Sequence, residues 1–544
     1  MNKKIATALS MGLVLTVAAT ACSSGSKESK DPGTPSGDKK GARVKLSLFH
    51  TNAGITIPDG TDLNNNPWIN IVKDKANVDL EVEIPPYTDF PTKFNLLLAS
   101  GSLPDIVQGY DPIAAYKAAR DGAFIDLKPY YDKSPLLQKV VTPQMMELAK
   151  DTVSGKYWRI PMAYDKGPQG QGVFARYDLV QKYNDGKWPE TIDEWIELLR
   201  KIKKAVPDSI PMSNRVIGDT LFGYGGAVFF NLFGADPYGF RIQSGKIVPN
   251  VLLPEYKAAV DVYRQLYAEG IFDQEFATNT NDKWFPKWNS KNVLFQWNSA
   301  DQLLPGIVPV SGQVGTATMA PEARFAFAPD LKTYPSVVSD PRYAKGFLGT
   351  PISGHGMYVS SQSKNPDRAF QVIEAFASDE LREAVFWGKE GDTYTVQAGK
   401  RVPIADKLGD PNRTWSRVYA LLFGYTDGQD AQQALYEQKA GADYFKLAKD
   451  SMKQRQTDAE ANGLNSLIGY AAPDDAAKKT SEMKQALNKF TTEAIMGKIT
   501  MDQFDQARKD WEKQYRTLVY GPMQAYLDAN KDYLIKLGVK QAGW

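Results

Sequence analysis

The chain has 544 residues, with 65 Lys and Arg against 63 Asp and Glu and a formal net charge of +2. Its near-neutrality argues against a nucleic-acid ligand, because binding to phosphates requires a basic surface. A single cysteine excludes disulfides and thiolate metal sites. The length is sufficient for two large lobes.

The first residues, 1–21, are predicted to be a signal peptide. Two lysines precede an uncharged, mostly apolar stretch, which ends in small residues and a threonine directly before Cys22. The stretch is too short and too weakly apolar for a membrane-spanning helix, which needs about 20 strongly apolar residues. Its end resembles the lipobox of bacterial lipoproteins, although Ala19 stands where leucine is commoner, and predicts lipidation of Cys22. The alternative is an ordinary cleaved signal with an incidental cysteine.

Residues 22–42 are predicted to be the lipidated cysteine and a disordered tether. After Cys22 the segment consists almost entirely of Ser, Gly, Pro and charged residues, which cannot bury apolar surface. A flexible segment of roughly 20 residues spans about 25 Å. We therefore expect it to hold a folded body clear of a membrane surface.

The body begins with the order strand, helix, strand, helix, strand. Alternating hydrophobicity predicts strands at 43–50 and 78–84, and a short apolar run predicts a third at 104–107. One intervening helix is opened by Pro67, and the next is ended by Gly101. This order is typical of an α/β lobe with a largely parallel sheet.

Three later helices are predicted from their start signals. Thr191 with Glu194 and Thr500 with Gln503 have the spacing of capping boxes, and Asn365 is an N-cap before a proline. The residues expected on the buried faces of these helices are Trp195, Leu198, Leu199 and Ile202, then Ala369, Phe370, Ile373 and Phe376, then Phe504, Ala507, Trp511, Tyr515 and Leu518.

No sequence context identifies a catalytic site. A glycosidase needs two carboxylates that converge on one bond, and no acid here stands in a context that marks it for this role. The two histidines, His50 and His355, have no nucleophile signature beside them, and phosphate-binding and HExxH motifs are absent. We expect no enzymatic activity. A surface polysaccharide-degrading enzyme stays open as an alternative, since its size and aromatic content would be similar.

Several segments together resemble the extracellular solute-binding proteins of ATP-driven (ABC) sugar importers. The resemblance is to their large oligosaccharide-binding lipoprotein branch, which includes the alginate-binding proteins. The segments occur in the order of that family and are FNLLLASGSLPDIVQG (94–109), DGAFIDLKPYYDK (121–133), GKYWRIPMAY (155–164), VFARYDLVQKY (173–183), WPETIDEWIELLRKIK (188–203), SKNPDRAFQVIEAFASDE (363–380) and FWGKEGDTY (386–394).

The resemblance implies a two-lobed α/β fold of the periplasmic-binding-protein type (type II), with hinge crossovers and a ligand cleft between the lobes. The N-terminal lobe would comprise 43–164 and 349–400, and the C-terminal lobe 165–348 and 401–544. The chain would act as a monomeric receptor that is lipid-anchored on the outer face of a Gram-positive membrane. It would capture a carbohydrate, expected to be an oligosaccharide, and deliver it to a permease.

Some relatives in this branch carry a calcium-binding loop after the helix that corresponds to 191–204. Here the loop reads AVPDS (205–209), with one acid where several oxygen ligands are required. We therefore expect no calcium site at this position and no other cofactor. Three alternatives to the sugar receptor remain: the same fold with a non-sugar solute such as a peptide, the enzyme named above, and a sensory or adhesive glycan-binding lipoprotein.

A sugar site needs aromatic rings to stack on and polar side chains that bind hydroxyls. Ligand sites in α/β lobes lie beyond the carboxyl ends of the strands. Trp297 is the first candidate, because relatives of the alginate-binding type have a tryptophan at the end of the corresponding strand; a core tryptophan is the alternative. The candidates chosen by strand ends and by the crossover are Asn52 (beside His50 and Thr51), Gln108, Tyr110, Asp111, Tyr164, Trp297, Asn298 and Asp301.

Four further candidates come from local context. Tyr224 and Tyr425 stand in glycine-flanked loops, His355 stands between glycines before a strand, and Trp387 belongs to a segment that resembles a family hallmark. Each has a structural alternative, as a packed ring or a turn residue. Trp284 and Trp288 have helical spacing, and packing is the expected role for both.

Overall fold

The computed structural model describes residues 42–52, 55–86, 89–110, 112–163, 170–299, 323–420, 427–462, 467, 469–470, 472–540 and 543–544. The predicted signal peptide, the lipidation site and nearly all of the predicted tether lie outside these residues. Among the described residues no helix combines the length and the hydrophobicity that crossing a bilayer requires.

The larger sheet has five strands in the order β2-β1-β3-β12-β4. The alternation predicted for β2 is confirmed, because its buried side chains alternate with exposed ones, whereas β1 ends in two consecutive buried residues, Leu48 and Phe49. β1 pairs in parallel with β2 and β3, whereas β12 is antiparallel to both β3 and β4. The strands are β1 (Val44–Phe49), β2 (Val78–Glu83), β3 (Ile106–Gly109), β12 (Ile352–Val359) and β4 (Ile160–Ala163).

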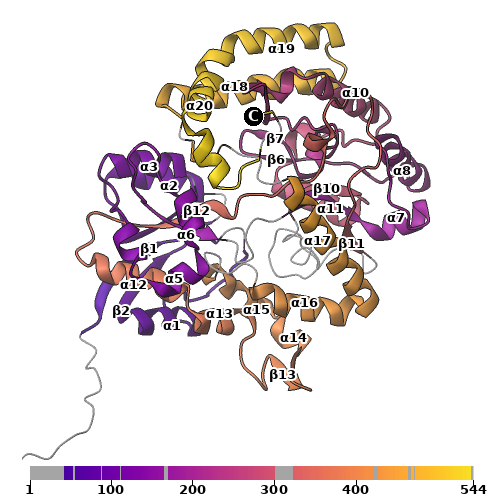
Figure 1. Ribbon diagram of the computed structural model, residues 1–544. Helices are drawn as coiled ribbons and strands as arrows, with labels where there is room; N and C mark the ends of the chain where they lie inside the picture. Colours follow the sequence, from indigo (N-terminus) through magenta and orange to yellow (C-terminus); the bar gives the residue numbers. More distant parts are fainter. Residues whose placement is uncertain are drawn as a thin grey trace, which may run out of the picture. The chain divides into compact units, whose positions relative to one another are not determined.

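Helices cover the larger sheet (Figure 1), and two of their ends follow the predicted signals, because Pro67 begins α1 and Gly101 follows the end of α2. The Asn66 side chain accepts the Ile69 N–H in the first turn of α1, and Asn77 ends this helix in the left-handed conformation, with φ 51°. α1 packs against α12. The helices of this part are α1 (Pro67–Ala76), α2 (Phe90–Ser100), α3 (Pro112–Arg120), α4 (Lys128–Tyr131), α5 (Pro135–Val140), α6 (Pro143–Leu148), α12 (Pro366–Phe376) and α13 (Asp379–Phe386).

A second, antiparallel sheet has β5 at its centre, between β10 and β11. Two-stranded hairpins and helices surround it. The strands are β5 (Gln171–Arg176), β10 (Phe295–Ser299) and β11 (Phe325–Phe327), with hairpins β6 (Arg215–Ile217) and β7 (Thr220–Gly223), β8 (Phe240–Gln243) and β9 (Lys246–Pro249), and β13 (Tyr394–Gln397) and β14 (Lys400–Pro403). The helices are α7 (Tyr177–Asn184), α8 (Ile192–Ala205), α9 (Val228–Leu232), α10 (Pro254–Ala268) and α11 (Asn281–Ser290).

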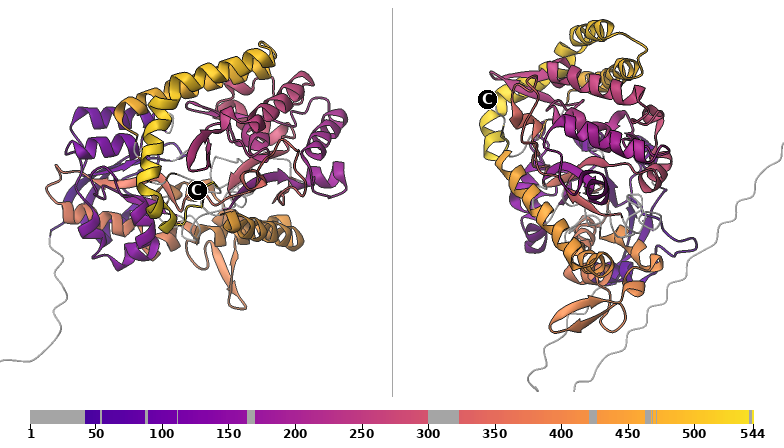
Figure 2. Two further views of the ribbon diagram at one scale, coloured as in Figure 1. Left: turned by 45° about the horizontal axis from the view of Figure 1, so that its top comes forward. Right: turned by 90° about the vertical axis from the view of Figure 1, so that its right-hand side faces the viewer.

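The chain ends in a run of helices. These are α14 (Ala405–Leu408), α15 (Pro411–Thr414), α16 (Asp427–Ala440), α17 (Ala442–Asn462), α18 (Asp474–Ile495), α19 (Met501–Tyr515) and α20 (Gly521–Lys536). A hydrogen bond from the Tyr533 hydroxyl to Glu147 Oε1, at 3.0 Å, joins α20 to α6. Figure 2 shows α20 beside the helices of the larger sheet.

Two extended segments connect the region of the larger sheet with that of the smaller one. β4 leads toward β5, and the segment before β12 returns. The two segments pair through the Gly170–Leu348 bridge and through the Gln171 N–H, which donates to the Phe347 carbonyl at 2.8 Å. The lobe boundaries implied by the resemblance stay predictions.

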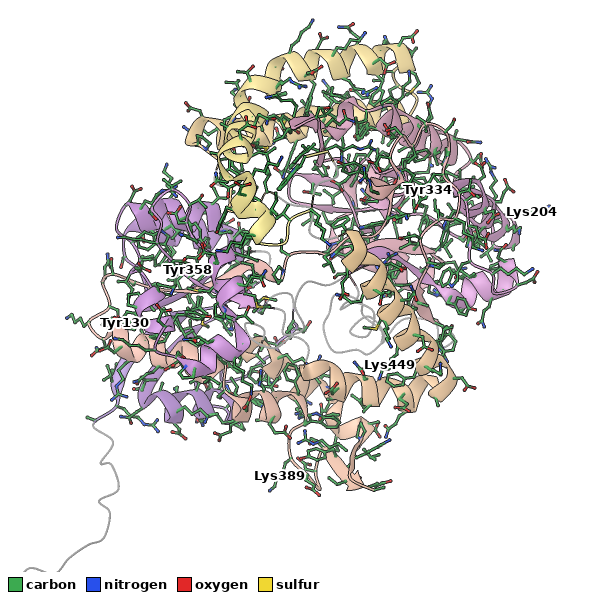
Figure 3. All side chains as sticks on the ribbon, in the orientation of Figure 1. Tyr130, Lys204, Tyr334, Tyr358, Lys389 and Lys449 are labelled. Carbon is green, nitrogen blue, oxygen red and sulfur yellow. The ribbon has the colours of Figure 1, made fainter. Side chains whose placement is uncertain are left out.

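Most of the expected buried faces are buried, and three local predictions need correction. Trp195, Trp284, Trp288, Phe370 and Trp511 all lie in the core. In Figure 3, Tyr358 lies among the elements of the larger sheet, whereas Lys204 and Lys389 point outward. The packing role expected for Trp284 and Trp288 is therefore confirmed.

The first correction concerns Leu518, which is 48% exposed, while Val519 is buried. Residues Arg516–Tyr520 form a π-helical turn, which holds one extra residue and shifts the buried face by one position.

The other two corrections concern the predicted helix caps. The Glu194 carboxylate accepts from the Glu190 N–H, so the predicted box with Thr191 is half formed, and the Asn365 side chain makes no capping hydrogen bond.

Candidate functional site

The carboxyl ends of β1 and β3 bring His50 and Gln108 together. His50 is fully buried, and its Nδ1 lies 2.6 Å from Gln108 Oε1. The same Oε1 accepts the Thr51 N–H at 2.8 Å, which fixes the orientation of the amide. His50 Nε2 lies 2.7 Å from the Val418 carbonyl oxygen, so this histidine also links the larger sheet to the segment after α15.

The two ring nitrogens of His50 face two acceptors, and a neutral imidazole can donate to only one of them. The hydrogen bonds to Val418 and Gln108 favour the protonated ring, whereas burial favours the neutral one. Burial is the larger effect, so the pKa of His50 lies below its ordinary value.

His355 joins the same group from the antiparallel strand β12. Its Nδ1 lies 3.3 Å from Gln108 Nε2, and its ring lies 6.4 Å from that of Tyr110. Burial and the nearby positive charge of Arg159 lower the pKa of His355 to about 4. The structure thus brings together three of the predicted site residues, Gln108, Tyr110 and His355, as one polar cluster at the edge of the sheet.

Two other predicted residues at this edge and at the smaller sheet make local contacts. The Asn52 amide nitrogen donates to the Ile55 carbonyl at 3.1 Å. Asn298 Nδ2 donates to Gln296 Oε1 at 3.2 Å, and Asn298 Oδ1 accepts the Ser299 N–H. Both amides are half-buried, so each keeps some accessible surface.

Trp297 lies within β10, where it pairs with Val173 of the central strand. Its side chain is half-buried, and the ring centroid is 6.4 Å from that of Phe347, in the segment that leads to β12. The indole Nε1 is buried and has no hydrogen-bond acceptor among the described residues. Trp297 is therefore placed next to a connecting segment rather than in the middle of a core.

Tyr224 and Trp387 contact other groups. The Tyr224 ring stacks on Trp284 at 5.6 Å, beneath the guanidinium of Arg215 at 4.9 Å. Trp387 is buried, and its ring lies 5.2 Å from the Arg401 guanidinium. These ring contacts do not connect either residue to the polar cluster, and the ligand role of both stays a prediction. The predicted residues Asp111, Tyr164, Asp301 and Tyr425 lie outside the described residues.

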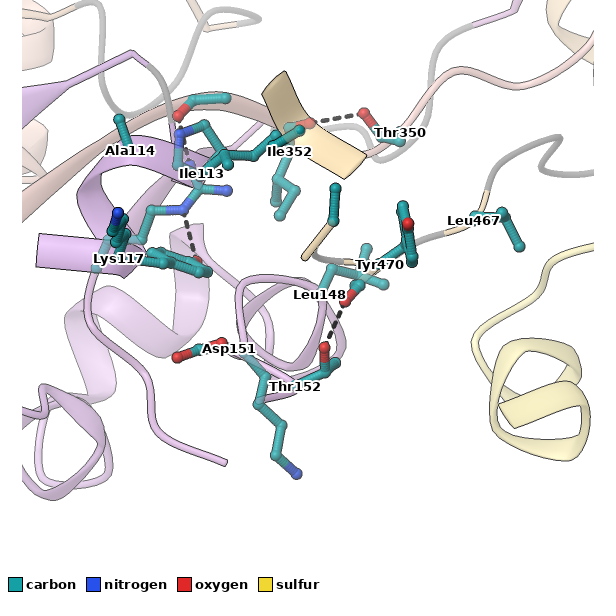
Figure 4. Close-up of a pocket in the computed structure, with 18 of the residues that line it drawn as sticks. Ile113, Ala114, Lys117, Leu148, Asp151, Thr152, Thr350, Ile352, Leu467 and Tyr470 are labelled. Carbon is teal, nitrogen blue, oxygen red and sulfur yellow. Dashed lines mark hydrogen bonds between the residues drawn. The ribbon is translucent and has the colours of Figure 1, made fainter. Parts of the chain in front are cut away.

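A cavity of about 510 Å³ adjoins the polar cluster (Figure 4). Its walls come from α3, the residues after α6, the start of β12 and the chain that leads into α18. Ser353 and Gly354 line it, directly before His355. The Thr152 hydroxyl donates to the Gly469 carbonyl at 2.6 Å and joins two of the walls. None of the predicted site residues that the structure describes lines this cavity.

Arg159 is the functional candidate that the sequence analysis missed. It precedes β4, lines the cavity and is 4% exposed. It fills an irregularity in the pairing of β12 with β4, between Ile352 and Gly356. The one signal in the sequence was a cationic residue directly before the apolar strand that begins at Ile160. The pattern of such a short strand does not show whether the cation is exposed or buried.

No group of three or more His, Cys, Asp or Glu side chains in the described part of the chain is placed to hold a metal ion. At the loop where some relatives would bind calcium, Lys203 Nζ donates to the Ser209 carbonyl oxygen at 2.8 Å. A lysine ammonium therefore contacts an oxygen of this loop.

Comparison with known proteins identifies the family. Lipoprotein LipO of Bacillus subtilis is 21% identical over 494 residues, which cover 86% of this chain and 89% of LipO. The polygalacturonan/rhamnogalacturonan-binding protein YtcQ of the same species is 25% identical over 456 residues, which cover 80% of this chain and 83% of YtcQ.

Solved structures agree with the fold. The substrate-binding protein FusA of S. pneumoniae in complex with kestose superposes with a TM-score of 0.64 at 18% identity, over 90% of this chain and 100% of FusA. The alginate-binding protein AlgQ2 without calcium ion gives 0.62 at 17% identity, over 90% of this chain and 99% of AlgQ2. At such identities the likeness shows the fold alone, which is the two-lobed α/β fold of solute-binding proteins. Residues 64–383 match the family described as bacterial extracellular solute-binding protein, and the chain belongs to that family.

Proposed function

We propose that the protein is the substrate-binding lipoprotein of an ABC importer and that its ligand is a carbohydrate, specifically an oligosaccharide. The observation that carries this proposal is the cluster of Gln108, Tyr110 and His355 at the carboxyl edge of the larger sheet, where α/β lobes bind ligands. Tyr110 and His355 are half-buried, and tyrosine and histidine side chains bind sugar hydroxyls and stack on sugar rings. Gln108 is buried and contacts His355.

The ligands named for similar proteins support the carbohydrate class. YtcQ is named for two pectic polymers, and FusA was solved with the fructooligosaccharide kestose. Another neighbour, an N-glycan transport protein of S. pneumoniae, was solved with a mannose-containing glycan. These ligands differ in monomer and charge but are all saccharides.

The proposed mechanism is capture by closure of two lobes. A ligand that touches both lobes only in the closed state stabilises that state, in proportion to the difference between its affinities for the two states. The connecting strands near Gly170 and Leu348 are where such a motion would turn. Energy for import would come from a separate ATPase subunit.

We also propose the surroundings in which the receptor works. A lipid on Cys22 would hold it at the outer face of a Gram-positive cell membrane, and residues 23–42 would serve as its tether. It would act as a monomer, meet a permease subunit pair, and need no metal ion or other cofactor.

A thermal-shift and calorimetric screen of plant, algal and host oligosaccharides tests the proposal. We expect at least one saccharide to raise the unfolding temperature and none to be shortened. If only a peptide raises the unfolding temperature, the carbohydrate assignment is wrong. If chromatography shows that a glycan chain has been cut, the protein is an enzyme.

A further inference from the structure

Arg159 is a buried cation without a carboxylate partner in the described part of the chain. Its Nη1 donates to three successive carbonyl oxygens of β12, those of Ser353, Gly354 and His355, at 2.9, 2.8 and 2.7 Å. Its Nε donates to the Tyr116 hydroxyl at 3.0 Å. Nη2 donates to no described residue. All described partners of this guanidinium are neutral.

Three other buried arginines pair with a carboxylate. A buried charge is costly unless an opposite charge and hydrogen bonds compensate for it. The pairs are Arg176 with Asp178 at 2.5 Å, Arg241 with Glu255 at 2.8 Å, and Arg455 with Asp330 at 2.6 Å. An anion would compensate for the buried charge of Arg159 in the same way, but this side chain lines a cavity and contacts no described carboxylate.

Cationic side chains outnumber acidic ones among the described residues that line the cavity. Lys117, Arg120, Lys150, Arg159 and Lys478 are cationic and Asp151 is acidic, while Lys150 also pairs with Glu147 at 3.3 Å. The Asp151 carboxylate is already engaged, because it accepts from Arg120 Nη1 at 3.1 Å, Trp158 Nε1 at 3.0 Å and the Ser154 hydroxyl at 2.6 Å. These donors hold the pKa of Asp151 below its ordinary value, although burial opposes them, so the carboxylate stays charged and bound.

The size and the apolar part of the lining indicate a ligand larger than an inorganic ion. The volume of about 510 Å³ lies within the range of roughly 300–1,000 Å³ that is usual for small-molecule sites. Ile113, Leu148, Ile352 and Tyr470 line it together with the cations (Figure 4). Such walls suit a molecule with an apolar face and one negative group.

We propose that this cavity binds the carboxylate of a uronic acid unit, so that the saccharide carried by the protein is an acidic one. Arg159 Nη2 donates to the carboxylate, and Lys478 attracts the anion from the exposed end of α18. The inference rests on the proposed function for the carbohydrate class and adds the charged group that the site selects.

The test compares three probes by calorimetry on the mature chain: trigalacturonate, its carboxyl-reduced neutral counterpart, and inorganic phosphate. We expect the wild type to bind trigalacturonate about tenfold more tightly than the neutral form, as a charge-assisted hydrogen bond predicts. Arg159→Gln should abolish this preference, so that the acidic and the neutral trisaccharide bind this variant equally.

Lys478→Glu keeps the proposal testable if Arg159→Gln fails to fold. It should weaken trigalacturonate binding several-fold, and less so in high salt. Lys489→Glu is the matched control, because Lys489 is exposed on the same helix and does not line the cavity. Equal affinities of these two variants for trigalacturonate would overturn the inference.

The remaining outcomes separate the inference from the proposed function. Equal wild-type affinity for the acidic and neutral trisaccharides would overturn the inference and leave a neutral-sugar receptor. Phosphate binding as tight as that of trigalacturonate would show a site for free anions and would also overturn it. If no saccharide in the wider screen binds, the proposed function itself fails.

Discussion

The half-buried indole of Trp297 combines an apolar ring with an N–H that no described residue accepts. A sugar that stacks on the accessible part of this ring would gain contact area. We expect Trp297→Ala to weaken the best saccharide of the screen by about 1–3 kcal/mol, or roughly 5- to 150-fold, measured by calorimetry. Trp188→Ala is the control, since Trp188 is equally half-buried but packs on Tyr177. An unchanged affinity would remove Trp297 from the site.

The histidine of the polar cluster makes stability depend on pH. The pKa of His355 is about 4 in the folded protein, against an ordinary value of 6.5, so the unfolded chain binds more protons between these two values. Stability is therefore full above pH 6.5 and falls as the pH drops from 6.5 toward 4, by at most about 1.4 kcal/mol per pH unit for this group.

His355→Gln removes this contribution. Its unfolding free energy, from denaturant titrations at pH 7, 6 and 5, should fall less steeply than that of the wild type. Subtracting the unfolding free energy of the variant from that of the wild type at each pH removes the contribution of the titratable groups that both proteins retain. Parallel curves would show that His355 titrates normally in the folded state.

At the scale of elements, the helix caps predicted from the sequence should differ in how much they contribute to the free energy of unfolding. Thr500 and Gln503 form both hydrogen bonds of a capping box at the start of α19, whereas the Asn365 side chain makes no cap bond at α12. Thr500→Ala should lower the unfolding free energy by about 1 kcal/mol. Asn365→Ala should change it much less, and denaturant unfolding of both variants measures the contrast. Equal losses would mean that helix propensity, and not the cap, sets these values.

At the scale of the whole molecule, stability should not depend on a divalent metal. Calcium usually binds through several carboxylate and carbonyl oxygens, and the loop 205–209 offers one acid beside the ammonium of Lys203. We expect EDTA and added calcium to leave the unfolding temperature unchanged. A drop with EDTA that calcium reverses would reveal a metal site.

The sequence predicted the strands and helix ends that follow from the local order of residues. Alternation predicted β1 and β2, and Pro67 and Gly101 correctly marked helix ends. The rule of carboxyl strand ends placed Gln108 in the cluster. It did not reveal Arg159, whose three carbonyl partners lie 194–196 residues away in a strand with shifted register. Helical periodicity also misplaced Leu518, because a π-turn has no signature in an apolar pattern.

That π-turn has a consequence for the evolution and redesign of the C-terminal helices. Deleting Leu518 would convert the turn to ordinary α-helix and rotate everything after it by about 100°. Tyr533 would then face away from Glu147, and α20 would lose its hydrogen bond to α6. The extra residue in the π-turn thus determines which side of α20 faces α6. We expect related chains that lack it to pack this helix against α6 through different side chains.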